Sequence, residues 1–588
     1  MEADDSAGRA LAELPAGTLL LAVAAAMAES LAPVPLLTVL KHPLVGGVDE
    51  ARLAWLEQVR LLDLALRGPR PAPGIEGLTR HFQEREHQRQ RGCRGCLAAW
   101  EGLRPTLALL DEAPAALSLA QFATRVAQAA EALAGDNAWR GQNGRIAAEL
   151  LADLQGLEEA QRLAVTPEDG LAILRQLLEA QRVRPPYGGH PRVFIWGLLE
   201  ARLQQADLMI LGGLNEGVWP AAPAPDPWLA PKIRANLGLP GLEYRIGLSA
   251  HDFASALGAP EVLITRARRD GRSPTVASRF WLRLKAMTGG LPHDIRLERL
   301  AVAVDDMGMP RPVDRPQPCP PVADRPKKIS VTSVDRLKAD PFAFYAREML
   351  KLSSLDPVDA DHSAAWKGTA VHAVLEQWLA QDRCDPDRLL ARARALLADQ
   401  AIHPMLRALW QPRLMEAIRW VEGLERANQA EGRLPLAAEK RGEATIAGVT
   451  VYGTADRIDR LSNGGIAIVD YKTGKPPAPK AIEGGFALQL GLLGLIAQGG
   501  GFKEIAGAPD AHEYWSLTKY GDKFGRCVRP DAKEGADAFL ERALRSFTAT
   551  AGDYLTGEKP FVAKLNPAFA PYGDYDQLMR LEEWYGRS

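Results

Sequence analysis

The stretch that decides the fold of the C-terminal half runs from Gly453 to Gly474 and reads GTADRIDRLSNGGIAIVDYKTG. Two short apolar runs flank Asn463-Gly464-Gly465, which is a strong signal for a β-hairpin turn. Because alternate side chains of a strand share a face, Asp470 and Lys472 point to the same side of the second strand. Charge inside a strand usually costs stability, so this pair indicates a functional site or a solvated surface.

The length of the turn decides whether Asp456 joins Asp470 and Lys472. A two-residue turn would place Asp456 opposite Tyr471 and away from Asp470, whereas a three-residue turn over 463–465 would place it opposite Lys472. The glycines supply the positive φ that the longer turn needs, so we predict a three-residue turn over 463–465 or an equivalent bulge.

Two carboxylates and a lysine on one strand face suit a divalent cation and a phosphodiester. Hard oxygen ligands select Mg²⁺ or Mn²⁺, and an ammonium group can position the attacking water. The competing interpretation is a solvated hairpin with a chance Asp-x-Lys, which is a very common tripeptide.

Composition sets wide limits on the class of protein. A chain of 588 residues is too long for one hydrophobic core, so at least two domains are expected. The formal net charge of -2 neither supports nor excludes a nucleic-acid partner. Five cysteines and an acidic start favour a reducing cytoplasm, and the apolar run over 14–45 is interrupted too often to span a membrane.

Cys93 and Cys96 form a CxxC motif, which is the one cysteine spacing here that suggests a metal. A structural zinc site needs a second pair of ligands, and the sequence contains no other CxxC and no HxxxH. We therefore interpret the motif as two ordinary thiols at the start of a helix.

The proline-dense residues 305–328 divide the chain into an N-terminal part, 1–304, and a C-terminal part, 329–588. In the first part, helical patterns precede β-like runs at 192–197, 207–220 and 259–271, which is typical of an α/β region. In the second part, a helix with one apolar face is predicted over 366–380, a hairpin-rich region over 436–471, and further helices over 486–497 and 536–554. We predict a multidomain α/β protein whose second half has a small mixed sheet flanked by helices.

The blocks GTADRID and IVDYKTG, with GTAVHAVLE upstream, resemble the RecB-type branch of the PD-(D/E)XK nucleases over roughly 329–588. Carried over by position, the resemblance implies that Asp456 and Asp470 are metal-binding carboxylates and that Lys472 is the catalytic lysine. It makes His372 a further metal ligand and the Tyr471 carbonyl a possible one. Without the resemblance, an isolated histidine beside an apolar helix face would usually be interpreted as a packed or surface residue.

Three other positions in the second half are less clearly assigned. Gln489 matches the glutamine of the family's QxxxY block and is expected to contact DNA, although Leu493 stands where the family has tyrosine. Glu439 or Glu443 could be an auxiliary acid, but a solvated carboxylate at a strand edge is the preferred interpretation for either.

The first half, including RVFIWGLLEARLQQADLMILGGLNEGVWP, resembles the AddB-type subunits of AddAB helicase-nucleases in their alphaproteobacterial form. The resemblance implies a superfamily 1 helicase-like region, in which Arg266 or Arg268 of VLITRAR would correspond to an arginine that reaches nucleotide phosphate, or would bind DNA. No GxxxxGK[ST] motif occurs in the sequence, so neither an ATP site nor independent unwinding is expected.

AddB-type proteins are longer, so the chain is expected to correspond to the C-terminal portion of one. Many of them hold an iron-sulfur cluster through four cysteines, and the matching positions here are Asp340, Ala570, Gly573 and Met579. No cluster is therefore expected, and packing by Phe342, Tyr572 and Tyr575 is expected to hold this region together.

The leading expectation is a Mg²⁺-dependent DNA exonuclease domain of an AddB-like subunit in double-strand break repair and recombination. The alternative is a non-catalytic DNA-binding scaffold that docks an AddA-like helicase. A stand-alone exonuclease of a mobile element is a third possibility, but it should lack the AddB-like first half. The expected partners are DNA ends, single strands and an AddA-like subunit, with no membrane.

Overall fold

The computed structural model describes residues 3–87, 93–111, 116–184, 190, 192–222, 228–241, 243–271, 273–309, 311–360, 364–397, 404–521, 523–570 and 573–586. The chain divides into two compact units. Unit 1 comprises residues 1–30, 38–56 and 105–310, and unit 2 comprises residues 31–37, 57–104 and 311–588. Within the described ranges, no helix has both the length and the apolar character needed to cross a membrane.

Unit 1 contains a helical part in which α1 packs against α6, α7 and α9. The apolar residues of α1, including Leu19, Leu20 and Val23, are almost fully buried. The helices of this part are α1 (Pro15–Ala28), α6 (Leu119–Ala134), α7 (Gly141–Gly156), α8 (Glu158–Arg162) and α9 (Pro167–Ala180), with the short strands β2 (Arg9–Ala10), β3 (Leu117–Ser118), β4 (Ala164–Val165) and β5 (Arg182–Val183).

The rest of unit 1 is an α/β part built on a parallel pair of strands, β7 (Leu208–Leu211) and β8 (Glu261–Ile264). The predicted runs at 207–220 and 259–271 contain these strands. Trp219 and Phe253 lie in the small core beside the pair. The other elements are β1 (Asp4–Asp5), β6 (Phe194–Ile195), α10 (Pro231–Asn236), α11 (Glu243–Ala256), α12 (Arg279–Thr288) and α13 (Ile295–Asp305).

Unit 2 contains a six-stranded mixed sheet with the order β10-β11-β12-β13-β14, in which β9 also pairs with β11. The β11–β9 and β12–β13 pairs are parallel and the others are antiparallel. The strands are β9 (Lys328–Ser330), β10 (Leu434–Ile446), β11 (Val449–Arg460), β12 (Ile466–Lys472), β13 (Pro509–Tyr520) and β14 (Lys523–Val528). The prediction of a mixed sheet flanked by helices is confirmed.

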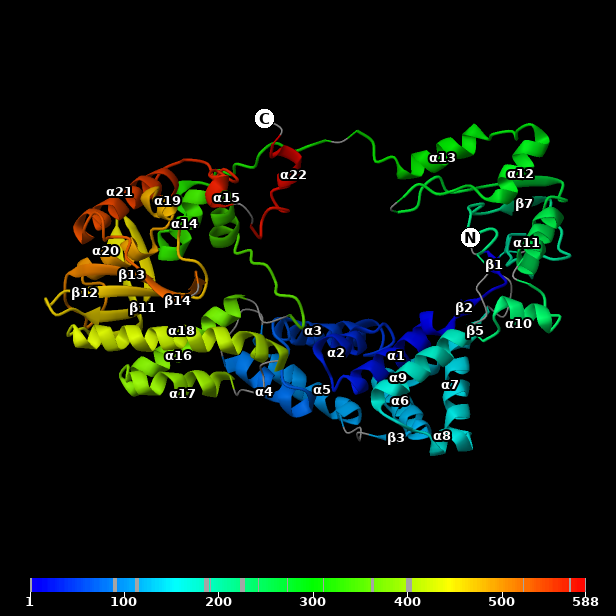
Figure 1. The fold of residues 1–588 in the computed structure, drawn as a ribbon, viewed down its shortest axis with the longest axis horizontal. Coiled ribbons are helices and arrows are strands. Elements are labelled where there is room, and N and C mark those ends of the chain that lie inside the picture. Colours follow the sequence, from blue (N-terminus) through cyan, green and yellow to red (C-terminus); the bar gives the residue numbers. More distant parts are fainter. Residues whose placement is uncertain are drawn as a thin grey trace. The chain divides into compact units, whose positions relative to one another are not determined.

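Helices cover both faces of this sheet (Figure 1). One core lies between the sheet and α14, α20 and α21, and the other lies between the sheet and α16, α17 and α18. The helices of unit 2 are α4 (Gly74–His87), α14 (Val331–Ala339), α15 (Pro341–Phe344), α16 (Ala364–Asp382), α17 (Pro386–Leu397), α18 (Pro404–Ala430), α19 (Pro479–Glu483), α20 (Gln489–Gln498), α21 (Ala536–Tyr554) and α22 (Leu581–Trp584). Three further helices have residues in both units: α2 (Pro33–Lys41), α3 (Asp49–Ala65) and α5 (Cys96–Asp111).

The predicted position of the β11–β12 turn is wrong by one residue. Arg460 pairs with Ile466, and the Leu461 N–H donates to the Gly465 carbonyl at 2.9 Å. The three-residue turn is therefore 462–464, with Gly464 at a φ of +87°. The β11–β12 pairs end at Arg457 and Val469, so Asp456 is not paired with Lys472; its Oδ2 accepts the Tyr471 N–H at 2.7 Å.

Gly453 is a position in the opening stretch that has no room for a side chain. A Cβ added there would lie 2.8 Å from Leu493 Cδ2 and 2.8 Å from Val331 Cγ2. The glycine therefore lets α14 and α20 approach β11 closely, and Leu493, at the position of the family's tyrosine, packs into this contact with 1% of its surface exposed.

A buried lysine, Lys564, lies in the region of Asp340, Ala570, Gly573 and Met579. The Lys564 ammonium lies 2.7 Å from Asp576 Oδ1 and 3.7 Å from Asp340 Oδ2, and it donates to the Ala570 carbonyl at 2.9 Å. Asp340 also accepts the backbone N–H groups of Ala343 and Lys564. A carboxylate, two residues without donor side chains and a thioether do not fit an iron-sulfur cluster, and an ammonium group lies beside two of these positions.

Apolar packing contributes to the same region. Phe342, Tyr575 and Met579 belong to one small core, and the Tyr575 hydroxyl donates to the Leu352 carbonyl at 2.8 Å. The expected roles of Phe342 and Tyr575 are thus confirmed, whereas Tyr572 lies outside the described residues.

We expect Lys564→Met to lower the local stability of this region by about 2 kcal/mol, because Asp340 would lose its buried cation while keeping its two backbone donors. Hydrogen exchange of the amides of α15 and residues 573–579 should show this as roughly 30-fold faster opening. Lys559→Met, which removes a half-exposed ammonium paired with Asp553, is the matched control and should change little. Equal protection in both variants would contradict a structural role for Lys564.

Candidate active site

Five elements of unit 2 bring the candidate residues together. His372 comes from α16, Glu439 from β10, Asp456 from β11, Asp470 to Lys472 from β12, and Gln489 from the first turn of α20. The apolar face of α16, formed by Val371, Val374, Leu375 and Trp378, packs on the sheet and so places His372 at the edge of that contact. The site therefore depends on α16 and α20 lying on opposite faces of the same strands.

His372, Glu439 and Asp456 form a group of possible metal ligands, with one donor atom of each within 4.8 Å of the others. His372 Nδ1 lies 3.4 Å from Glu439 Oε1 and 3.7 Å from Asp456 Oδ2, while its Nε2 lies 3.2 Å from the Tyr471 carbonyl oxygen. Three oxygen donors and one imidazole fit a hard divalent cation such as Mg²⁺ or Mn²⁺. The structure thus brings together three of the four predicted ligands, His372, Asp456 and the Tyr471 carbonyl.

Glu439 is the residue that sequence reasoning undervalued. It lies in β10 between Ala438, which pairs with Arg457, and Lys440, which pairs with Ala455, so that it faces Asp456 across the ladder. Its φ of +45° is unusual for a residue with a side chain, and such strained positions cluster at functional sites. Its place opposite the Asp456 of GTADRID could have singled it out only with the β10–β11 register known.

The fourth predicted ligand, Asp470, is held by two other candidate residues. Lys472 Nζ lies 2.6 Å from Asp470 Oδ2, and the Gln489 amide donates to Asp470 Oδ1 at 2.6 Å. Gln489 also accepts from Lys472 Nζ at 3.2 Å. Gln489 was predicted as a DNA contact; in the structure its amide closes a ring with Asp470 and Lys472, which fixes the positions of both.

The electrostatics of the site favour a bound cation. Burial, and then the neighbouring charge of Asp470, raise the pKa of Asp456 to about 7, and burial raises the pKa of Asp470. Burial lowers the pKa of His372, but its hydrogen bond to Glu439 and the charge of Asp456 outweigh this and raise the pKa overall. A divalent ion would remove the repulsion between the carboxylates, so metal binding and proton release should be linked.

The start of α20 is fixed by a further carboxylate. Asp335 of α14 accepts the Leu488 N–H at 2.7 Å, directly before Gln489. Burial raises the pKa of Asp335 to about 7. This contact fixes the backbone at the start of α20, from which the Gln489 side chain extends.

Arg266 and Arg268, the predicted DNA or nucleotide contacts, lie in unit 1 after β8. The Arg266 guanidinium lies over Trp281 at 5.4 Å from the ring centroid, and Arg268 pairs with Glu298 at 2.7 Å. Neither belongs to the group of residues around Asp456, and their role in binding stays a prediction.

The CxxC motif forms the start of α5. Cys93 and Cys96 are buried, and Glu86 accepts the backbone N–H groups of Gly95 and Leu97. Burial raises the pKa of Cys96 to about 12, which keeps the thiol protonated. In the part of the chain that the structure describes, the one group of possible metal ligands does not include these cysteines.

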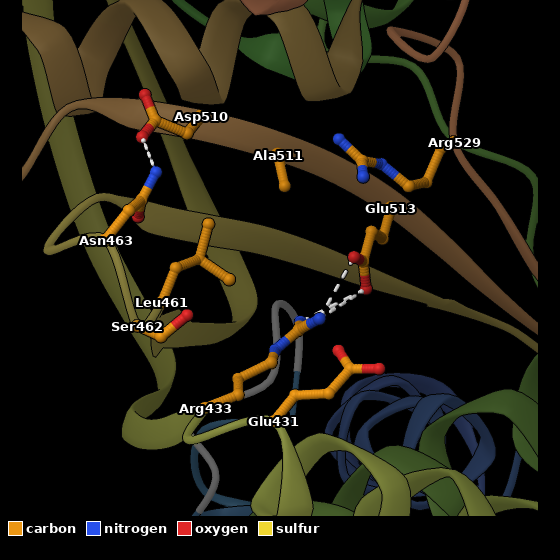
Figure 2. Close-up of a pocket in the computed structure, with 9 residues that line it drawn as sticks. All are labelled: Glu431, Arg433, Leu461, Ser462, Asn463, Asp510, Ala511, Glu513 and Arg529. Carbon is orange, nitrogen blue, oxygen red and sulfur yellow. Dashed lines mark hydrogen bonds and ion pairs between the residues drawn. The ribbon is translucent and has the colours of Figure 1, made fainter.

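A separate pocket lies near the turn 462–464, and several of the side chains that line it bond one another (Figure 2). Figure 2 shows Arg433 directed at Glu513, with Asn463 bonded to Asp510. Arg433 Nη1 lies 3.0 Å from Glu513 Oε1, and its Nε lies 2.7 Å from Asp459 Oδ2, so this cation is already satisfied. The pocket, of about 330 Å³, is therefore the outer end of a buried ion network.

Comparison with known proteins supports the assignment of the second half. Residues 328–564 match the model of the PD-(D/E)XK nuclease superfamily. Proteins described as uncharacterized from Rickettsia bellii and Rickettsia conorii are each 25% identical, over 62% and 51% of this chain. The chain spans only 45% and 37% of their lengths. A solved structure titled "Crystal structure of SSO0001" is 12% identical and covers 43% of this chain and 83% of its own, with a TM-score of 0.18.

Proposed function

We propose that the PD-(D/E)XK nuclease superfamily domain at residues 328–564 is a Mg²⁺-dependent DNA exonuclease, and that the chain belongs to an AddB-like subunit that processes double-strand ends for recombination. The observation that carries the nuclease proposal is the convergence of Asp456, Asp470 and Lys472 with His372 and Glu439 on the neighbouring strands β10, β11 and β12 and the helix α16. The AddB-like role rests on the motifs of the first half and on the order of the two parts.

The residues of the site divide into two groups with different tasks. His372, Glu439, Asp456 and the Tyr471 carbonyl would hold the cation, which when bound neutralises phosphate charge and acidifies water. Lys472 presents its ammonium to the attacking water and the phosphate, and Asp470 and Gln489 hold that ammonium in place. DNA would be bound mainly through its phosphates, so affinity should fall with salt.

The alternative, a scaffold that docks an AddA-like helicase, is favoured by one feature of unit 1. Leu208 and Ile210 of β7 are 48% and 58% exposed on the same face of the strand. Exposed apolar residues in this arrangement are typical of a surface that another chain or domain covers. A nuclease could also dock a partner, so only the absence of DNA cleavage distinguishes the scaffold from the proposed nuclease.

The test of the proposed function is digestion of end-labelled linear single- and double-stranded DNA. We expect shortening of the labelled strand with Mg²⁺ and none with excess EDTA. Because protons compete for Asp456 below pH 7, the Mg²⁺ concentration for half-maximal activity should rise as the pH falls from 8 to 6. Failure of the protein to cleave, alone or with an AddA-like subunit, would favour the scaffold.

We expect Glu439→Gln to weaken Mn²⁺ binding, measured by calorimetry, roughly 10- to 100-fold, since an amide replaces a charged ligand. Glu443→Gln is the matched control: it lies on the same strand, and its carboxylate pairs with Lys328 at 2.5 Å instead of joining the group. Equal Mn²⁺ affinity in the two variants would remove Glu439 from the proposed site.

A further inference from the structure

The sheet of unit 2 is open on one side of β11, next to the candidate active site. On this side β9 pairs with Thr450 to Tyr452, and β12 pairs with Arg457 to Arg460. In the ladders of the described residues, the segment from Gly453 to Asp456 has no strand partner on this side. The two neighbouring strands thus diverge where the Asp456 carboxylate is presented.

A cavity of about 470 Å³ lies at this opening. We call it the interstrand pocket; it is lined by Ser330, Val331, Thr332, Arg441, Tyr452, Gly453, Thr454 and Gln489. Its volume lies within the range of small-ligand sites, about 300–1,000 Å³. All of these residues except Val331 and Gly453 have polar side chains, so the pocket suits a polar ligand.

Gln489 connects the interstrand pocket with the catalytic candidates. It lines the pocket, and its amide bonds both Asp470 and Lys472. A group bound in the pocket would therefore lie next to the phosphate on which Lys472 acts.

Arg441 gives the pocket its charge. It is exposed, pairs across the ladder with Thr454, and makes no ion pair with any residue in the described ranges. Its guanidinium lies 5.1 Å from the centroid of the Tyr452 ring, an arrangement that orients the cation without neutralising it. By contrast, the nearby Lys328 is already paired with Glu443.

We propose that the interstrand pocket binds the nucleotide next to the cleaved bond in a single DNA strand. Arg441 contacts its phosphate, and the hydroxyls of Thr332 and Thr454 supply further hydrogen bonds. An exposed guanidinium with several hydroxyls is the donor set that a phosphodiester requires. A recess of this volume accommodates one nucleotide of one strand and not a base-paired duplex. The inference rests on the proposed nuclease function, whose site it extends.

The test compares Arg441→Gln with Arg526→Gln in the full chain. Arg526 is the matched control, because it also lies over a tyrosine, Tyr520, at 4.3 Å but does not line the pocket. Binding of a fluorescein-labelled oligo(dT) strand is measured by anisotropy in EDTA over a range of salt concentrations. We expect Arg441→Gln to raise Kd about tenfold and to reduce the slope of log Kd against log salt by about 0.7, the value for one phosphate contact on a single strand.

A second measurement locates the contact along the strand. One methylphosphonate is placed at successive positions of the oligonucleotide, which removes the charge of a single phosphate. Substitution next to the cleaved bond should slow the wild-type protein about tenfold and leave Arg441→Gln unaffected. A Kd and a salt slope equal to those of wild type in Arg441→Gln would overturn the proposal. The binding measurement requires no cleavage, so this failure is distinct from a failure of the nuclease function.

Discussion

Lys472→Ala is expected to slow metal-dependent cleavage of labelled single-stranded DNA by about 10²- to 10⁴-fold, the range of a positioned proton-transfer or water-orienting group. In the structure this ammonium lies 2.6 Å from Asp470 Oδ2 and 3.2 Å from Gln489 Oε1. Alanine would remove the only lysine of this group and leave the ligands His372, Glu439 and Asp456 in place. The measurement is the single-turnover rate at saturating DNA and Mg²⁺.

Lys475→Ala provides the control for this experiment. Lys475 lies three residues further along the chain and is exposed, so its loss tests the general effect of removing a positive charge beside the site. DNA affinity should fall only slightly in either variant, since the proposed role of Lys472 concerns the reaction. Equal rates for Lys472→Ala and wild type would refute the proposed site, even if the protein cleaves DNA.

Arg457→Leu is expected to have the largest effect on stability, about 3–5 kcal/mol, because it breaks a buried ion network. Arg457 Nη2 lies 2.7 Å from Glu425 Oε2, and its Nε lies 2.6 Å from Asp459 Oδ1. All three side chains are fully buried. Leucine would leave Glu425 without its cation and Asp459 with Arg433 alone.

Hydrogen exchange is the suitable measurement, since a chain with two compact units need not unfold in one step. Amides of β11 and α18 should exchange roughly 10²- to 10⁴-fold faster in Arg457→Leu. Arg460→Leu, on the same strand, is the control: this arginine is partly exposed and makes only a long bond to the Ala506 carbonyl, at 3.4 Å. A loss of protection below about 1 kcal/mol in Arg457→Leu would mean that the network contributes little.

The role of Asp459 shows where sequence reasoning stopped. As one of the three acids of GTADRIDRLSNGGIAIVDYKTG, it had two open interpretations, a solvent-facing carboxylate or a partner for an arginine such as Arg457. The structure selects the second, and adds Arg433 as a further partner at 2.7 Å. No local sequence pattern predicts this arrangement, because Glu425 lies in α18 and Arg433 lies between α18 and β10, and both are separated from β11 by the whole of β10.

The ligand group illustrates the same limit. Asp456, Asp470 and Lys472 could be assigned from spacing and family resemblance, because alternation along a strand fixes the face of each side chain. Glu439 could not, since its place opposite Asp456 depends on the register of β10, which runs unshifted from the Ile446–Val449 pair past Glu439 to the Ala437–Ile458 pair. A bulge between Glu439 and the β10–β11 turn would have turned its side chain to the other face.

The sequence by itself determined the α/β character of the second half, the β11–β12 hairpin and the common face of Asp470 and Lys472, because turn residues and strand alternation are local properties. Tertiary structure alone decided which residues complete the site. It brought His372 from α16 and Gln489 from α20 to the same strands, and in the described residues it left one side of β11 without a strand partner next to Asp456. These features depend on how helices pack on both faces of a sheet and on where neighbouring strands diverge, and both are set by contacts between residues far apart in the chain.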